Sequence, residues 1–187
     1  MVLVAFVARA GESVVLPVVV HVATIDGAAV VPEGFVAERV ARANEIFAPY
    51  KVAFEVRATV PLAGQHAALE TKADRDALSA YAKRGAIDWF VVRSLRDVDD
   101  RTQLRRGVHW HSQTQSGTHF VIVSSIAGPN VLAHELGHYL GNPAHSEVAG
   151  NLMSYTPGEG LPLLDDKQQK RMARTLRAYL KSGELKP

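Results

Sequence analysis

Apolar residues recur along this chain with two different periods. Residues 14–24 are rich in β-branched side chains, which is typical of a buried strand, and the apolar residues 2–8 are expected to pair with it as a first strand. Residues 50–60 alternate apolar with polar side chains, which predicts a half-exposed strand. Further strands are predicted at residues 87–92, 107–112 (an edge strand) and 118–125.

Helical spacing separates these strands. Residues 35–47 carry apolar side chains at helical intervals, and Pro49 ends the pattern. The other helices are expected at residues 71–84, 130–140 and 165–180, and residues 142–160 form a loop rich in Gly and Pro. This order predicts an α/β (α+β) fold, in which helices pack on a mixed twisted sheet with an antiparallel edge strand.

Composition narrows the class of protein. The chain has 187 residues, of which 47% are hydrophobic and 21% charged, as expected of one globular domain. It contains no cysteine, which excludes disulfides, thiolate metal sites and a cysteine nucleophile. No apolar run approaches the roughly 18 residues of a membrane span.

Charge gives no sign of a nucleic-acid partner. The formal net charge is +2, and the densest basic run, residues 101–106, follows Asp97, Asp99 and Asp100. We therefore interpret that run as a solvated loop. The three aspartates lack the ligand spacing and the glycine of a calcium loop, so a calcium site there is unsupported.

The helix expected at residues 130–140 carries His134, Glu135 and His138. Histidines four residues apart share one face of a helix, so both imidazoles can reach one zinc ion at about 2 Å from each nitrogen. Glu135 then lies beside the metal, where its carboxylate can take the proton of a water whose pKa the zinc lowers. The apolar face that packs this helix into a core consists of Val131, Leu132, Leu136 and Leu140.

A third ligand is expected just after this helix. Gly141 lets the helix stop and turn back, because glycine adopts a positive φ at little cost, and Pro143 forbids further helix. The chain then presents His145, and three nitrogen ligands with an open fourth position are typical of a catalytic zinc. A carboxylate, Glu147 or Asp165, is the competing third ligand.

This part of the chain resembles the metzincin clan of zinc endopeptidases, and most of all its pappalysin and serralysin branches. The resemblance rests on the pattern His-Glu-x-x-His-x-x-Gly, on the following His145, and on Met153 within Asn-Leu-Met-Ser-Tyr. The resemblance is strongest over residues 118–155. It implies that Met153 forms an apolar floor under the histidines and that Tyr155 approaches the zinc or donates to the oxyanion. The third histidine of the clan usually falls where this chain has Ala144, so an extra residue must be absorbed before His145.

The resemblance also implies a cleft between an upper subdomain, residues 1–141, and a lower one, residues 142–187, within a single catalytic domain. Its edge strand would bind extended substrate as a further strand. The candidate substrate-binding residues are Gly107, Val108, His109, Trp110 and His111.

Histidines of the edge strand allow other interpretations. His109 and His111 share a face because strand side chains alternate. They are interpreted as polar edge residues, with a second metal site or the lining of the cleft as alternatives. His119, which begins the next strand, is ambiguous between the site and the structure.

Together these features predict a zinc-dependent endopeptidase with one catalytic Zn²⁺. We expect a monomer, secreted or extracytoplasmic, that acts on protein or peptide substrates. The alternatives are a zinc-bearing binding module without turnover and a zinc hydrolase of a non-peptide amide or ester.

Overall fold

The computed structural model describes residues 13–187, so the strand expected at residues 2–8 lies outside the described part. Its main sheet is mixed, as expected, with neighbouring strands in the order β2-β1-β5-β8-β7 and β3 beside β1. Only β7 and the short β2 run antiparallel to their neighbours. The strands are β1 (Val14–Ile25), β2 (Ala28–Ala29), β3 (Val52–Leu62), β5 (Ile87–Val92), β7 (Gly107–His111) and β8 (His119–Ser124). A separate parallel pair consists of β4 (Ala68–Leu69) and β6 (Ser94–Leu95).

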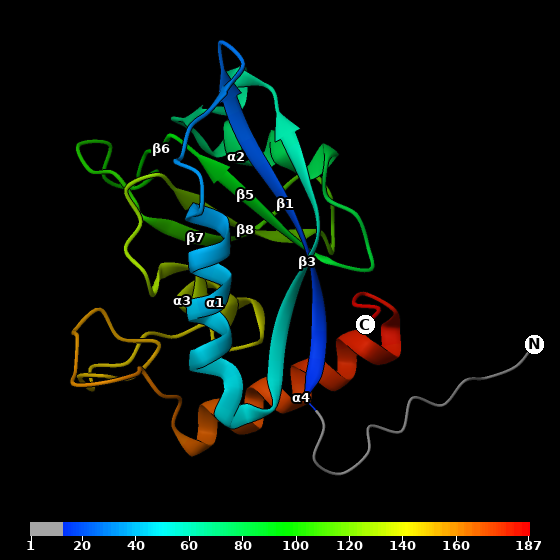
Figure 1. The fold of residues 1–187 in the computed structure, drawn as a ribbon, viewed down its shortest axis with the longest axis vertical. Helices are drawn as coiled ribbons and strands as arrows, with labels where there is room; N and C mark the ends of the chain where they lie inside the picture. Colours follow the sequence, from blue (N-terminus) through cyan, green and yellow to red (C-terminus); the bar gives the residue numbers. More distant parts are fainter. Residues whose placement is uncertain (1–12) are drawn as a thin grey trace, which may run out of the picture.

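Apolar side chains cover both faces of this sheet. Every residue of the central strand β5 is buried, which suits a parallel strand with neighbours on both sides. On one face α1 (Phe35–Phe47) packs beside α3 (Val131–Tyr139), while α4 (Asp166–Ser182) crosses the lower ends of β1 and β3 (Figure 1). On the other face a second core gathers residues of β5, β7 and β8 with the segment that follows β3.

The helix expected at residues 71–84 is shorter in the structure. Thr71 and Asp74 form a capping box that begins α2 (Lys72–Ala77). The Ser79 hydroxyl then donates to the Asp76 carbonyl at 2.5 Å and competes with the helical backbone bonds. The chain tightens into one turn of 3₁₀ helix, Leu78–Ala80, and the α-helix does not continue to Arg84.

The end of α4 brings the C-terminal segment back to the sheet. Asp165 and Gln168 form the capping box of this helix, and Gly183 closes it with a φ of 70°. Leu185 then forms a parallel bridge with Gly85, which brings Glu184 back against the sheet. The chain thus returns its C-terminal segment to β8.

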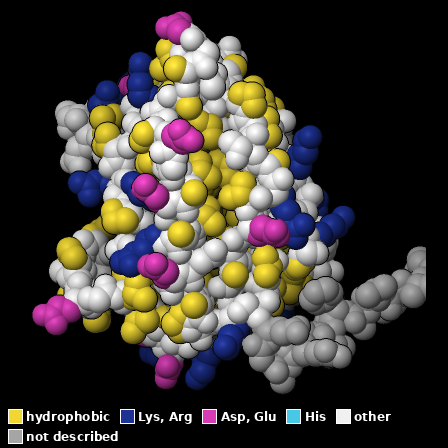
Figure 2. Space-filling model, in the orientation of Figure 1, with side chains coloured by type: hydrophobic (Ala, Val, Ile, Leu, Met, Phe, Trp, Pro, Cys, Tyr) yellow, Lys and Arg dark blue, Asp and Glu magenta, His cyan; other side chains and the backbone are white. Residues whose placement is uncertain are grey.

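The described surface carries mixed charge. On the face that shows α1, Lys and Arg side chains are interspersed with Asp and Glu (Figure 2). Within residues 13–187, no helix combines the length and apolar character needed to cross a membrane.

Candidate metal centre and cleft

Helix α3 packs through one face and presents two histidines on another. Leu132, Leu136 and Tyr139 are buried in the main core. His134 and His138 follow one another by one turn, and their Nε2 atoms lie 3.1 Å apart. The apolar spacing that fixes the helix on the sheet therefore also fixes the separation of the two imidazoles.

His145 joins this pair after the chain reverses. Gly141 has a φ of 95°, and its N–H donates to the carbonyl of His138. The Nε2 of His145 lies 3.2 Å from the Nε2 of His138. Among the described residues, His134, His138 and His145 form a group that could hold a metal ion.

The competing carboxylates do not join this group. Glu147 is not part of it. The Asp165 side chain accepts from the backbone N–H of Gln168 and so caps α4. The extra residue before His145 is accommodated in the loop, where Ala144 is exposed.

Hydrogen bonds set the tautomers of the two helical histidines. The Nδ1 of His134 lies 2.8 Å from the carbonyl of Leu152, and the Nδ1 of His138 lies 2.7 Å from the carbonyl of Asn142. A carbonyl only accepts, so each Nδ1 carries the proton and each Nε2 keeps its lone pair. Burial, aided by the neighbouring imidazoles, lowers the pKa of His138 to about 4.

The donor set fits a zinc ion. Tetrahedral coordination at about 2.0–2.1 Å separates ligand nitrogens by about 3.3 Å, close to the spacings of 3.1 and 3.2 Å found here. Three imidazole nitrogens at this spacing, two of them on rings oriented by backbone carbonyls, make a preformed cation site. Burial also lowers the pKa of His134 and His145, which favours the neutral form of both rings.

Met153 lies against α3 from below. A Cβ atom at Gly137 would lie 2.5 Å from the Met153 sulfur, so the thioether occupies the space that a side chain there would need. The Asn151 carboxamide oxygen accepts from the backbone N–H of Met153 at 2.8 Å. The same turn provides the Leu152 carbonyl that orients His134, so this segment supports the histidines in two ways.

The Tyr155 ring packs against two of the three histidine rings. It lies over His145, with centroids 4.4 Å apart, and over His134 at 5.6 Å. The side chain is exposed, and the relative accessible surface of the residue is 69%. Burial of part of the ring raises the pKa of Tyr155, with Arg105 opposing, so the phenol remains a proton donor at neutral pH.

Glu135 lies between α3 and the edge strand. It is buried, with 6% of its surface exposed, and burial raises the pKa of its carboxyl to about 8, opposed by the backbone N–H of His109 and by Arg105. A Cβ atom at Gly107 would lie 2.8 Å from the Glu135 carboxylate, so only glycine lets β7 pass this closely. A cation held by the neighbouring histidines would lower this pKa and favour the carboxylate.

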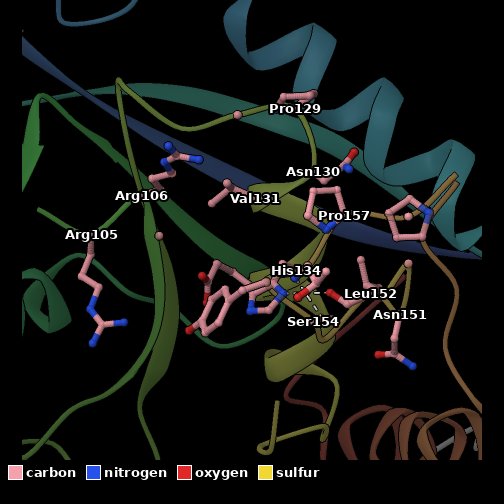
Figure 3. A pocket seen from close by; sticks show the side chains of 18 of the residues that line it. Arg105, Arg106, Pro129, Asn130, Val131, His134, Asn151, Leu152, Ser154 and Pro157 are labelled. Atoms are coloured by element: carbon pink, nitrogen blue, oxygen red, sulfur yellow. Dashed lines mark hydrogen bonds between the residues drawn. The ribbon is translucent and has the colours of Figure 1, made fainter. Parts of the chain in front are cut away.

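Two hollows lie on either side of these groups. One, of about 630 Å³, extends past the start of α3 and the loop 150–162. Figure 3 shows Arg106, Asn130, His134 and Ser154 around it. The other, of about 730 Å³, lies beside His138 and His145 and extends along β7. Glu135 and Tyr155 line both hollows, so the candidate catalytic groups lie where the hollows meet.

The edge strand divides its residues between two faces. Trp110 turns toward the second core, where its indole N–H donates to Asp76 at 2.8 Å and only 9% of its surface is exposed. Val108 lies on the same face. His109 and His111 project from the opposite face, where both rings contact His119, and both residues line the second hollow.

Sequence reasoning missed two contributors to this region. Arg105 pairs with Asp97 at 2.6 Å and lies close enough to Tyr155 and Glu135 to influence both pKa values. Glu184 contacts His119. No sequence signal marks Arg105, which belongs to the run interpreted as a solvated loop. The Asp97 carboxylate pairs with Arg105 and accepts from the loop amides of Asp99 and Asp100.

Comparison with known proteins identifies the fold. No family model and no curated protein matches this sequence. Among solved structures, mirolysin in complex with a compound aligns over 93% of this chain and 99% of its own, with a TM-score of 0.64 and 13% identity. Archaemetzincin from Methanopyrus kandleri aligns over 91% of this chain and 99% of its own, with a TM-score of 0.59 and 14% identity. The chain has a metzincin-like fold.

A third structure agrees with this assignment. Metalloproteinase-II from Bacteroides fragilis aligns over 89% of this chain and 55% of its own, with a TM-score of 0.58 and 14% identity. The metzincin-like chain thus shares its architecture with a solved metalloproteinase. The metzincin-like fold that the motif residues predict is thus confirmed by structural alignments that cover nearly the whole chain.

Proposed function

We propose that this chain is a zinc-dependent endopeptidase that hydrolyses extended protein or peptide substrates. The observation that carries the proposal is the convergence of three imidazole Nε2 atoms, two of which have their Nδ1–H bonded to backbone carbonyls. His134, His138 and His145 would hold the ion. The bound zinc would supply a Lewis acid that polarises the scissile carbonyl and lowers the pKa of the attacking water.

Glu135 acts as the proton carrier. Glu135 follows His134 on α3 and lines both hollows, in a buried position that raises the pKa of its carboxyl to about 8. A carboxylate of this kind accepts the proton of the attacking water and returns it to the leaving nitrogen. Burial between α3 and β7 holds the group in place for both transfers.

Tyr155 acts as a hydrogen-bond donor at the open side of the site. Its phenol stays protonated at neutral pH and can donate to the oxygen that becomes negatively charged. A donor of this kind contributes about 3–4 kcal/mol in related acyl-transfer reactions. Met153, with no exposed surface, and Gly141 have supporting roles below and beside the histidines.

The edge strand provides the substrate surface. β7 pairs with β8 on one side, and no described strand pairs with its other side. Gly107 and His109 pass beside Glu135, so a peptide added to this free edge would carry its backbone past the candidate catalytic groups. This arrangement favours an extended peptide over a small amide or ester.

Peptide profiling tests the proposal. Purified protein with one equivalent of zinc is incubated with a proteome-derived peptide mixture, and new termini are identified by mass spectrometry. We expect internal cleavage by the wild type, loss of cleavage in Glu135→Ala with zinc retained, and no loss in the matched control Glu147→Ala. Cleavage by Glu135→Ala at the wild-type rate would refute the mechanism. Zinc binding without any cleavage by the wild type would indicate a binding module instead.

A further inference from the structure

A second group of histidines lies on the sheet, apart from the candidate catalytic centre. We name His109 and His111 of β7 and His119 of β8 the edge-strand histidine cluster. His111 lies directly opposite His119 in the antiparallel register. His109 is two residues earlier on the same strand, so all three side chains project from one face.

Contacts within the cluster are close. The Nε2 of His109 lies 2.7 Å from the Nδ1 of His119. The ring of His111 stacks on that of His119 with centroids 5.1 Å apart and an angle of 7°. One ring nitrogen of each residue lies within 4.8 Å of the corresponding nitrogen of both others. The three donors therefore lie close enough to one another to bind one ion.

A carboxylate orients the middle imidazole. The Nε2 of His119 lies 2.5 Å from Glu184, which returns to the sheet after α4. Since a carboxylate accepts, the Nε2 of His119 carries a proton, and its Nδ1 faces His109. A histidine held by a carboxylate at one nitrogen and offering the other is the arrangement that supports metal ligands in proteins.

Aromatic side chains enclose the cluster on one side and leave it open on the other. Tyr139 stacks on His119 with centroids 4.3 Å apart, and Tyr179 lies at 5.5 Å. His111 is exposed and lines the hollow of about 730 Å³. An ion can therefore enter from the cleft, while the inner ligands are held by packing.

We propose that the edge-strand histidine cluster binds a second divalent cation of the zinc class. Imidazole donors favour Zn²⁺ and its late first-row neighbours over Ca²⁺ and Mg²⁺, which prefer oxygen ligands. The ion takes the place of the hydrogen bond between His109 and His119, and the neutral His109 ring offers its Nε2 lone pair in the tautomer that is protonated at Nδ1. It links β7, β8 and, through Glu184, the C-terminal segment.

This second site uses none of the donors assigned to the candidate catalytic zinc, and it does not rest on the proposed peptidase function. Metal content measured after dialysis against excess zinc tests it, with one variant for each site. We expect about two zinc ions per wild-type chain, one in His138→Ala, one in His111→Ala and none in the double variant. Gln113→Ala, an exposed neighbour, is the matched control and should keep both ions.

Other outcomes separate the two sites. A single ion lost in His138→Ala and retained in His111→Ala would overturn the second site and leave the catalytic one. A single ion that is retained in His138→Ala and lost in His111→Ala would confirm the second site and refute the first.

Stability provides a second readout. In the His138→Ala background, zinc should raise the melting temperature, and His111→Ala should abolish that rise. Glu184→Gln should weaken binding of the second ion about 10–100-fold, because the carboxylate no longer orients His119. His111 is exposed, so its replacement does not threaten the fold, and circular dichroism checks this. A zinc-induced rise of the same size with and without His111 would refute the site.

Discussion

Gly141 combines two demands that a set of glycine variants can separate. Its φ of 95° is a conformation that other residues rarely adopt, and a Cβ atom there would lie 2.2 Å from the Thr175 hydroxyl and 3.0 Å from the Thr175 Cβ. Rotation of the hydroxyl relieves the first contact but not the second. Gly141→Ala should therefore cost about 1–2 kcal/mol in backbone strain and about 1–3 kcal/mol in overpacking against α4.

Two other glycines supply the controls. Gly117 has a φ of 76° with nothing within 4 Å of an added Cβ, and Gly128 has neither a positive φ nor a close neighbour. Gly117→Ala therefore reports backbone strain alone, and Gly128→Ala reports neither backbone strain nor overpacking. Urea unfolding of the metal-free proteins gives the free energy of unfolding for each.

We expect the loss in free energy of unfolding to increase from Gly128→Ala to Gly117→Ala to Gly141→Ala. For Gly141→Ala the melting temperature should fall by about 5–15 °C in a chain of this length. Zinc affinity should fall as well, because this turn places His145. If Gly141→Ala costs no more than Gly117→Ala, the close approach of α4 to the end of α3 is wrong. The double variant Gly141→Ala/Thr175→Ala should recover part of the overpacking cost and none of the strain.

Three further predictions concern the site itself. Burial raises the pKa of Glu135 to about 8, so the unfolded chain loses this proton first and metal-free stability falls as pH rises from about 4.5 to 8. Glu135→Gln should therefore be more stable than the wild type at pH 8 but not at pH 4, as measured by urea unfolding; equal pH dependence would contradict this burial. Tyr155→Phe should lower kcat about 100-fold with little change in KM, and an unchanged kcat would remove the tyrosine from the mechanism. Chelation should abolish cleavage, and one equivalent of zinc should restore it; full activity after complete metal removal would exclude a metal-dependent reaction.

Local patterns explain why much of the fold could be predicted. Helix α1 spans the residues that its apolar spacing predicts, and Trp89 and its neighbours form the buried strand β5. His134 and His138 meet because a helical repeat fixes their separation, whatever the rest of the chain does. The Gly-Asn-Pro turn after α3 likewise brings His145 back within a few residues.

Groups distant in the sequence could not be predicted in this way. His119 meets Glu184 only because Leu185 bridges Gly85, a pairing of two segments with no shared pattern. His111 faces His119 because of the register of a hairpin whose connecting turn has no distinctive sequence. The end of α2 at Ala77 coincides with a side-chain hydrogen bond from Ser79 to the Asp76 carbonyl, which a propensity argument does not weigh.

The edge strand links the two histidine groups. The backbone N–H of His109 lowers the pKa of Glu135, while the ring of the same residue contacts His119 in the cluster. An ion in the cluster would hold β7 in place and so keep that N–H on the carboxylate. Loss of the ion in His111→Ala should let β7 move away and expose the carboxyl, which lowers the pKa of Glu135 because burial is the larger of the two effects of β7.

Since a general base acts as the carboxylate, the acid limb of the kcat/KM profile should then move to lower pH. The wild type assayed with saturating zinc, beside His111→Ala under the same conditions, measures this shift, and Gln113→Ala serves as the control. Superimposable profiles would show that the cluster and the catalytic carboxylate act independently, even though one residue of β7 contacts both.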